Sequence, residues 1–140
     1  MTQKDWEVYK FGGTSMKNAD ALKQVGNLIM NSDSDNIIVV VSAMSGMTDD
    51  LLSFSQTKDE KLLEAIESRY IETVGSLLKD SSGEQWLIEE FRQDIQKIKD
   101  LAEQKDHSSM NVEENEILGF GEIWSSKICL LYTSPSPRDA

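Results

Sequence analysis

The sequence predicts an α/β fold built around a parallel sheet, and three observations carry this prediction. A short strand at residues 6–9 leads into a turn with two adjacent glycines, Gly12 and Gly13. Residues 37–41 form a continuous run, IIVVV, which is typical of a strand buried on both faces of a parallel sheet. Most of the remaining chain, to about residue 128, repeats apolar side chains at helical spacing. We therefore expect a strand, a glycine turn, a helix, a second strand and then helices.

The turn after the first strand combines features suited to binding a phosphate group. Lys10 precedes the two glycines, and Thr14 and Ser15 follow them. Adjacent glycines let the backbone approach a phosphate closely, and N–H groups at the start of the next helix can hold it. The lysine adds the positive charge that a transferring phosphoryl group needs. Because the turn matches neither GxxxxGK[ST] nor GxGxxG, by itself it also fits a tight turn with a surface lysine.

The helix after the glycine turn is predicted over residues 18–30, where apolar side chains recur at helical spacing. The strand at residues 37–41 then breaks into a loop rich in small hydroxyl side chains, including Ser42 and Thr48. In open α/β sheets, ligands bind just beyond the carboxyl ends of such strands. We expect Thr48 to cap a short helix through Phe54, since the acidic residues after it suit the positive end of a helix.

Two long helices are predicted next. Apolar residues recur at helical spacing over residues 62–78 and again over 87–101, and a Ser-Ser-Gly turn at 81–83 separates the two runs. Their many charged side chains indicate a solvated face, and their aromatic side chains indicate core positions. His107 lies in a polar loop, where we expect it to be exposed and without a metal partner.

A final helical pattern over residues 117–128 contains the most unusual glycines of the chain. Gly119 and Gly121 flank Phe120 and are followed by Glu122. Each glycine inside a helix costs about 1 kcal/mol relative to alanine, which indicates that another backbone or a ligand approaches closely there. The carboxylate of Glu122 therefore stands next to a predicted point of close approach.

Composition excludes several classes of function. The chain has 140 residues and a net charge of −11, with a pI near 4.4, which argues against binding nucleic acid or a membrane surface. No apolar run approaches the ~20 residues of a membrane span, and the N-terminus lacks the apolar core of a signal peptide. Cys129 is the single cysteine, so no disulfide framework is possible. We expect a soluble, cytoplasmic protein.

Three segments in this order, KFGGTS at 10–15, VSAMSGMTD at 41–49 and GFGE at 119–122, closely resemble the N-terminal part of aspartate kinases. These enzymes are members of the amino-acid kinase family. The resemblance implies the N-terminal part of an amino-acid kinase fold, a parallel sheet core flanked by helices, which is incomplete in this chain. It also implies ATP-dependent phosphorylation of the side-chain carboxylate of L-aspartate to 4-phospho-L-aspartate, the first step of lysine, threonine and methionine biosynthesis.

The same resemblance assigns roles to particular residues. Lys10 is the expected catalytic residue, which stabilises charge on the transferring phosphoryl group. Ser42 and Thr48 are expected to face the amino-acid substrate, and Glu122 to pair with its α-ammonium group. The residues expected to contact the ATP phosphates are Lys10, Phe11, Gly12, Gly13, Thr14 and Ser15.

Mg²⁺ is expected only as part of MgATP. Asp49 and Asp50 are compatible with a magnesium site, but capping of the following helix is the preferred interpretation, so no metal ligand is predicted in the chain. The expected partners are L-aspartate and ATP, and the parent enzyme is expected to be a homo-oligomer. Whether the parent is monofunctional or fused to a homoserine dehydrogenase is left open.

Residues 129–140 resemble something else, the translation of a transposase mosaic-end sequencing adapter. A helical pattern runs without a capping signal into Ser-Pro-Ser-Pro, which cannot continue it. We expect residues 1–128 to be the N-terminal portion of a truncated catalytic domain and 129–140 to be a non-native tail. Two strands do not make an independent sheet, so the remaining strands and basic residues are expected in the missing half, and this fragment is expected to be inactive.

Two alternatives remain open. The first is another amino-acid kinase family member, acting on glutamate, carbamate or a nucleotide. The second is a non-catalytic acidic helical protein that acts by interaction. The KFGGTS turn and Glu122 favour aspartate over the other acceptors.

Overall fold

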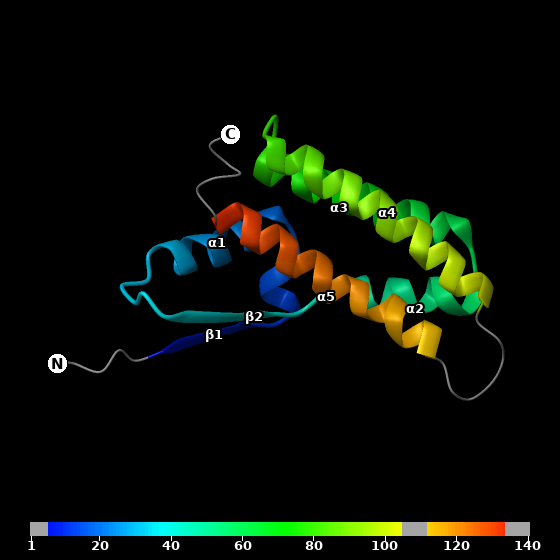
Figure 1. The fold of residues 1–140 in the computed structure, drawn as a ribbon, viewed down its shortest axis with the longest axis horizontal. Helices are drawn as coiled ribbons and strands as arrows, with labels where there is room; N and C mark the ends of the chain where they lie inside the picture. Colours follow the sequence, from blue (N-terminus) through cyan, green and yellow to red (C-terminus); the bar gives the residue numbers. More distant parts are fainter. Residues whose placement is uncertain (1–5, 105–111, 134–140) are drawn as a thin grey trace.

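The computed structural model describes residues 6–104 and 112–133. Strands β1 (Glu7–Phe11) and β2 (Ile37–Val41) pair in parallel, with Glu7 opposite Ile37 and Phe11 opposite Val41. The helices lie on one side of this strand pair (Figure 1). The predicted α/β class and the predicted strand–helix–strand order are therefore confirmed.

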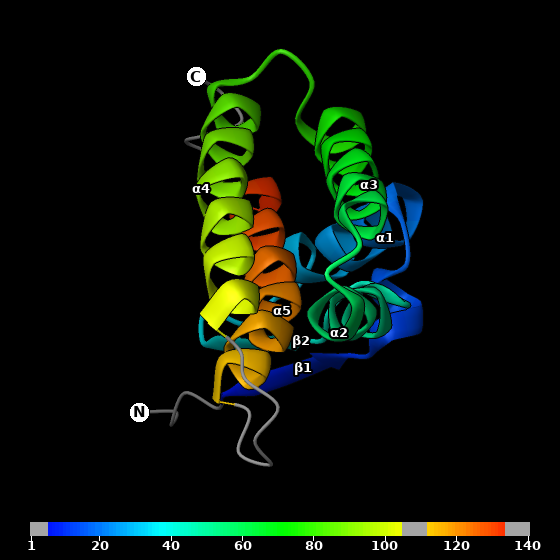
Figure 2. The ribbon, with the colours of Figure 1, turned by 90° about the vertical axis from the view of Figure 1, so that its right-hand side faces the viewer.

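One 3₁₀ turn and five helices make up the rest of the described chain. They are η1 (Gly13–Met16), α1 (Ala19–Met30), α2 (Met47–Thr57), α3 (Glu60–Leu78), α4 (Ser82–Gln104) and α5 (Val112–Thr133). Helix α5 runs above the sheet and contacts α1, α2 and α4, while α3 and α4 form a hairpin on the far side of α5 from the strands (Figure 2). None of the helices in the described ranges has the length and apolar character needed to cross a membrane.

Helix α1 forms where the apolar periodicity predicts it. Asn18 stands in extended conformation at its start, and its Oδ1 accepts a hydrogen bond from Ala21 N at 2.9 Å. This side-chain cap satisfies one of the free N–H groups of the first turn. Leu22 and Val25 face the interior and are buried, so α1 packs its apolar stripe against the rest of the fold.

The predicted capping role of Thr48 is wrong. Helix α2 begins at Met47, and the preceding residue, Gly46, occupies the capping position with φ of +80° and no side-chain cap. Thr48 therefore lies inside the first turn together with Asp49 and Asp50. A left-handed backbone at position 46 suits glycine, and it turns the chain into the helix two residues earlier than a cap at Thr48 would.

The turn between the two long helices is also shorter than predicted. Helix α4 begins at Ser82, and Ser81 provides the cap, because its Oγ accepts a hydrogen bond from Glu84 N at 3.1 Å. Asp80 adopts a positive φ of 61°, which completes the reversal. The expected Ser-Ser-Gly turn thus contributes one residue to the turn and two to the first turn of α4.

Helices α3, α4 and α5 meet at a buried aromatic cluster formed by Tyr70, Phe91 and Trp124. The Tyr70 and Phe91 rings are stacked with centroids 3.9 Å apart, and Phe91 and Trp124 lie 4.7 Å apart. Trp124 Nε1 donates a hydrogen bond to Oδ2 of the buried Asp94 at 3.0 Å. Burial, with added repulsion from nearby carboxylates including Asp94, raises the pKa of Tyr70 well above its usual range. The cluster fixes α5 against the helical hairpin.

The C-terminal part of α5 includes the first residues of the segment expected to be non-native. Cys129 is buried, and burial raises the pKa of its thiol to about 11. A Cβ atom added to Gly26 of α1 would overlap the ring of Tyr132, so the two helices are in close contact there. Residues 134–140, and the predicted exposed histidine His107, lie outside the described residues.

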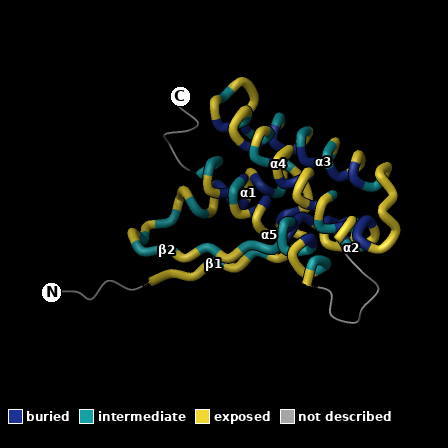
Figure 3. Tube along the Cα trace, turned by 45° about the vertical axis from the view of Figure 1, so that its right-hand side comes forward, coloured by how far each residue is buried: buried dark blue, intermediate teal, exposed yellow. Residues whose placement is uncertain are grey.

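One face of the strand pair is open, although the sequence predicts burial of β2 on both faces. Val8 is 64 % exposed, and Ile38 and Val40 are each 47 % exposed. The apolar and aromatic residues that alternate with these along the strands are half-buried (Figure 3), and Phe11 and Val41 among them pack against the core. The difference arises because the helices of the described ranges pack on a single face of the sheet (Figure 1).

The two faces of β2 should respond oppositely to the same substitution. Val40→Thr keeps the β-branched shape and removes apolar surface from the open face, so we expect lower binding of an apolar dye and little change in stability. Val41→Thr places a hydroxyl against the core and should lower the free energy of unfolding by about 1–3 kcal/mol. Dye fluorescence and urea unfolding measure both effects. Equal losses of stability in the two variants would contradict this assignment of the faces.

Candidate functional site

The carboxyl ends of β1 and β2 open into a polar hollow of about 400 Å³. Parallel pairing places both ends at one edge of the sheet, so the loops that follow the two strands lie side by side. Helix α5 supplies the third wall. The lining residues are Gly13, Thr14, Ser42, Ala43, Met44, Ser45, Gly46, Thr48, Asp49 and Glu122.

The first wall is the glycine turn after β1. Gly12 precedes a 3₁₀ turn in which Ser15 N donates to Gly12 O at 3.1 Å. A Cβ atom on Gly13 would lie 3.7 Å from Ala43 O, so this residue contacts the neighbouring loop. A Cβ atom on Gly12 would meet no atom within 4 Å, which leaves its backbone open to a ligand.

The second wall is the loop after β2. Ser42 N donates to Phe11 O at 3.0 Å, which extends the strand pairing by one residue and fixes Ser42 beside the glycine turn. Met47 N then donates to Met44 O at 2.9 Å and closes a tight turn into α2. The left-handed Gly46 completes this turn, and Thr48 follows on the first turn of the helix, where it lines the hollow.

The third wall is Glu122 on α5, and Gly121 allows it to come close. A Cβ atom on Gly121 would lie 2.9 Å from Ala43 Cβ and 3.5 Å from Met47 Cγ. The predicted close approach is therefore confirmed at Gly121. At Gly119, a Cβ atom would meet no atom of the described residues within 4 Å.

The hollow gathers residues from all three of the segments that the sequence singles out. Gly13 and Thr14 come from the first, Ser42 and Thr48 from the second and Glu122 from the third. The helical periodicity of residues 117–128 does not predict that Glu122 lies beside the two loops. The aromatic cluster explains this placement, because it holds Trp124, two residues beyond Glu122, in the core.

Lys10 does not line this hollow. It is exposed and stands opposite Val40 in the strand pairing, on the open face of the sheet. Gly12 is likewise exposed and outside the lining. The structure therefore places the predicted catalytic lysine at the carboxyl edge of the sheet, but directs it away from the three-walled hollow.

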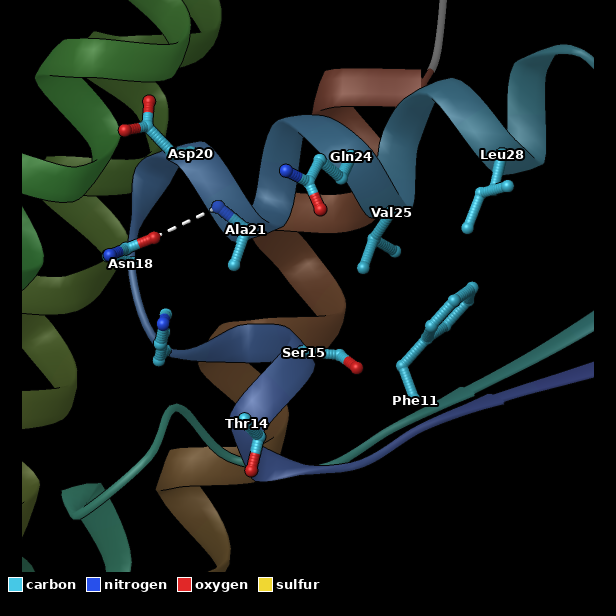
Figure 4. A pocket seen from close by; sticks show the side chains of 10 residues that line it. Phe11, Thr14, Ser15, Asn18, Asp20, Ala21, Gln24, Val25 and Leu28 are labelled. Atoms are coloured by element: carbon cyan, nitrogen blue, oxygen red, sulfur yellow. Dashed lines mark hydrogen bonds between the residues drawn. The ribbon is translucent and has the colours of Figure 1, made fainter.

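A second hollow, of about 470 Å³, lies on the other side of the glycine turn (Figure 4). Phe11, Thr14 and Ser15 line it together with one flank of α1, including Asn18 with its capping hydrogen bond. Thr14 is common to both hollows. Four of the six residues predicted to contact phosphates thus line at least one hollow: Phe11, Gly13, Thr14 and Ser15.

The lining of the first hollow combines negative charge with hydroxyl donors. Asp49 and Glu122 are its ionisable side chains, and Ser42, Ser45 and Thr48 supply hydroxyl groups. Carboxylates accept from an ammonium group, whereas hydroxyls can donate to a carboxylate oxygen. The arrangement suits a small ligand that carries both groups. Within residues 6–104 and 112–133, no three acidic, histidine or cysteine side chains gather as a metal site.

A parallel strand pair whose carboxyl ends open beside a glycine turn defines a small-ligand-binding α/β domain. The comparison of sequences makes the assignment specific. The profile described as "Amino acid kinase family" matches residues 5–132, and the chain belongs to this family.

Known relatives are named as aspartokinases. The chain is 32% identical over 132 residues to the bifunctional aspartokinase/homoserine dehydrogenase 2, chloroplastic, of Arabidopsis thaliana, covering 88% of this chain and 14% of that protein. It is 30% identical over 95 residues to the aspartokinase of Mycobacterium bovis, covering 56% of this chain and 23% of that protein. The chain thus spans a small part of each relative's length.

A solved structure shares the fold. Aspartokinase III of E. coli, in complex with aspartate and ADP, superposes with a TM-score of 0.80 at 22% sequence identity. The match covers 96% of this chain and 30% of that protein. The described arrangement of strands and helices therefore matches one part of a longer chain.

The two glycines of α5 provide a matched pair of substitutions. Gly121→Ala should lower the free energy of unfolding by about 1–3 kcal/mol, because its methyl group would overlap Ala43 and overpack this contact. Gly119→Ala meets open space and should raise stability by up to about 1 kcal/mol through helix propensity. Urea unfolding measures both. A neutral Gly121→Ala would show that α5 is not held against the β2–α2 loop.

Proposed function

We propose that residues 1–128 form the N-terminal part of the catalytic domain of an aspartate kinase. The parent enzyme transfers the γ-phosphoryl group of ATP to the side-chain carboxylate of L-aspartate and forms 4-phospho-L-aspartate. The observation that carries this proposal is the convergence of Gly13, Thr14, Ser42, Thr48 and Glu122 on one hollow.

The chemistry of this reaction explains why the site has no catalytic triad. A carboxylate with a pKa of about 3.9 is already ionised at neutral pH, so the nucleophile needs no general base. What the reaction requires is alignment of the two substrates and neutralisation of charge on the transferring group. A hollow lined by hydroxyl groups, main-chain groups and the carboxylates of Asp49 and Glu122 supplies this alignment.

Each wall has a role in this proposal. Glu122 accepts hydrogen bonds from the α-ammonium group of aspartate, which orients the amino acid. Ser42 and Thr48 donate to a substrate carboxylate from the edge of the sheet. The open backbone of Gly12 and Gly13 holds the phosphates, which arrive as MgATP. Mg²⁺ that arrives with the nucleotide would neutralise part of the phosphate charge.

Lys10 provides the positive charge at the phosphate side of the glycine turn. Its side chain stands on the open face of the sheet, where the rest of a longer domain would pack. The chain covers 14% of a plant relative and 30% of the E. coli structure, so the remaining contacts to ATP and aspartate come from sequence outside it. We further propose that the parent is a cytoplasmic homo-oligomer that serves lysine, threonine and methionine synthesis, and that the present chain is inactive alone.

The proposal is tested on the longer protein that contains this chain. Incubation with aspartate, MgATP and hydroxylamine should give aspartyl hydroxamate, because hydroxylamine traps an acyl phosphate. Glutamate, carbamate and nucleoside monophosphates serve as competing acceptors. Product with one of these, and none with aspartate, would reject the aspartate assignment while keeping the family.

In the longer protein, Lys10→Ala should lower kcat by about 10²–10³-fold, while the KM for aspartate changes little. The lysine charge matters most as the phosphoryl group moves, so its loss raises the barrier rather than weakening aspartate binding. Steady-state kinetics measure both constants. Lys23→Ala, on the exposed side of α1, is the matched control. A near-normal kcat would remove Lys10 from the mechanism.

Glu122→Gln should raise the KM for aspartate at least about tenfold and leave the KM for ATP nearly unchanged. Glutamine keeps the shape of the side chain but loses the charge that pairs with the α-ammonium group, and a charge-assisted hydrogen bond contributes about 1.5–3 kcal/mol. Glu116→Gln, on the exposed side of the same helix, is the control. Equal effects on both substrates would mark Glu122 as a structural residue.

A further inference from the structure

Arg69 of α3 reaches the two loops that form the hollow, although it lies far from both in the sequence. Its Nη2 donates to the carbonyl oxygen of Lys17 at 2.9 Å, at the end of the 3₁₀ turn that carries Thr14. Its Nη1 lies beside Gly46, where an added Cβ atom would be 3.9 Å away. One guanidinium group therefore stands between the outer ends of the glycine turn and the β2–α2 loop.

The base of Arg69 is held rigidly. The next residue, Tyr70, is stacked on Phe91 at 3.9 Å in the buried aromatic cluster. Thr73 Oγ1 donates to Arg69 O at 2.8 Å one helical turn further along. Because its backbone is fixed by the helical core, the Arg69 side chain holds the neighbouring loops at a set distance from that core. A planar guanidinium loses less side-chain conformational freedom on forming a hydrogen bond than an ammonium group does.

The two loops also meet each other directly near the ends of the strands. Ser42 N donates to Phe11 O at 3.0 Å at their inner ends, and Gly13 lies against Ala43. Further out, Arg69 donates its hydrogen bond to Lys17 O and its guanidinium lies next to Gly46, so it stands beside both loops. The hydrogen bond of Arg69 goes to a main-chain carbonyl rather than to a carboxylate, so its interaction depends on loop geometry and not on a partner's charge.

We propose that Arg69 is a positioning residue that clamps the glycine turn to the β2–α2 loop and so sets the distance between the two bound substrates. Its effect on catalysis rests on the proposed function, because the glycine turn would hold the phosphates and the second loop the acceptor. Arg69 is not among the residues lining the hollow, so it acts through the loops rather than by contact with substrate. Misplacement by about 1 Å can cost as much as 10²-fold in rate.

The clamp is tested with Arg69→Gln and Arg69→Lys in the longer protein. Arg92→Gln, at an exposed position of α4, makes the same charge change away from the site. In Arg69→Gln, we expect amide hydrogen exchange to rise about tenfold or more in segments 13–17 and 44–48, with α4 and α5 unchanged. We expect kcat per native molecule to fall roughly 10–100-fold, with both KM values within about threefold. Lysine can still reach the Lys17 carbonyl and should recover part of the loss.

Three results would overturn the clamp. Unchanged exchange in both segments would show that Arg69 does not hold them. An equal rise in exchange through α3, α4 and α5 would show a general loss of stability. A local rise with unchanged kcat would show that the clamp sets no catalytic distance. If the wild-type protein forms no aspartyl phosphate, the proposed function fails, and the exchange data alone then decide whether the clamp exists.

Discussion

The parallel pairing of β1 with β2 is the constraint on which the other features of the molecule depend. Two parallel strands cannot be joined by a tight hairpin, so the chain must cross over, and α1 makes this crossing. The same pairing brings both carboxyl ends to one edge, where the glycine turn and the β2–α2 loop become neighbours. The hydrogen bond from Ser42 N to Phe11 O shows that the pairing continues into the loops themselves. The hollow is thus a direct product of strand direction.

The helices convert this edge into a three-walled hollow. Tyr70, Phe91 and Trp124 join α3, α4 and α5 into one packed body, and the hydrogen bond between Trp124 and the buried Asp94 satisfies a polar group inside it. Since Trp124 lies two residues beyond Glu122, the core fixes where this carboxylate stands. Helix α5 therefore packs in the core on one side and lines the hollow on another.

The sequence predicted the strands and helices better than it predicted the helix caps and the contacts between distant elements. The IIVVV run and the periodicity of residues 18–30 were sufficient for β2 and α1, because both patterns reflect local geometry. The cap of α2 was mispredicted because Gly46, with its left-handed backbone, starts the helix instead of Thr48. Glu122 entered the predicted site through the family resemblance, and its placement depends on long-range packing that no local pattern records. Arg69 was missed for the same reason, since an arginine on an acidic helix has no local feature that links it to distant loops.

Gly121 and Ala43 are far apart in the sequence, but they fill the same small space between α5 and the β2–α2 loop. The backbone of α5 meets the loop after β2 so closely that a Cβ atom on Gly121 would overlap Ala43. The sizes of the residues at these two positions are therefore coupled. In related sequences, a larger side chain at one position therefore demands a smaller one at the other or a shift of the whole helix. Any such shift would carry Glu122 with it, so the size of two side chains outside the chemistry sets the width of the hollow.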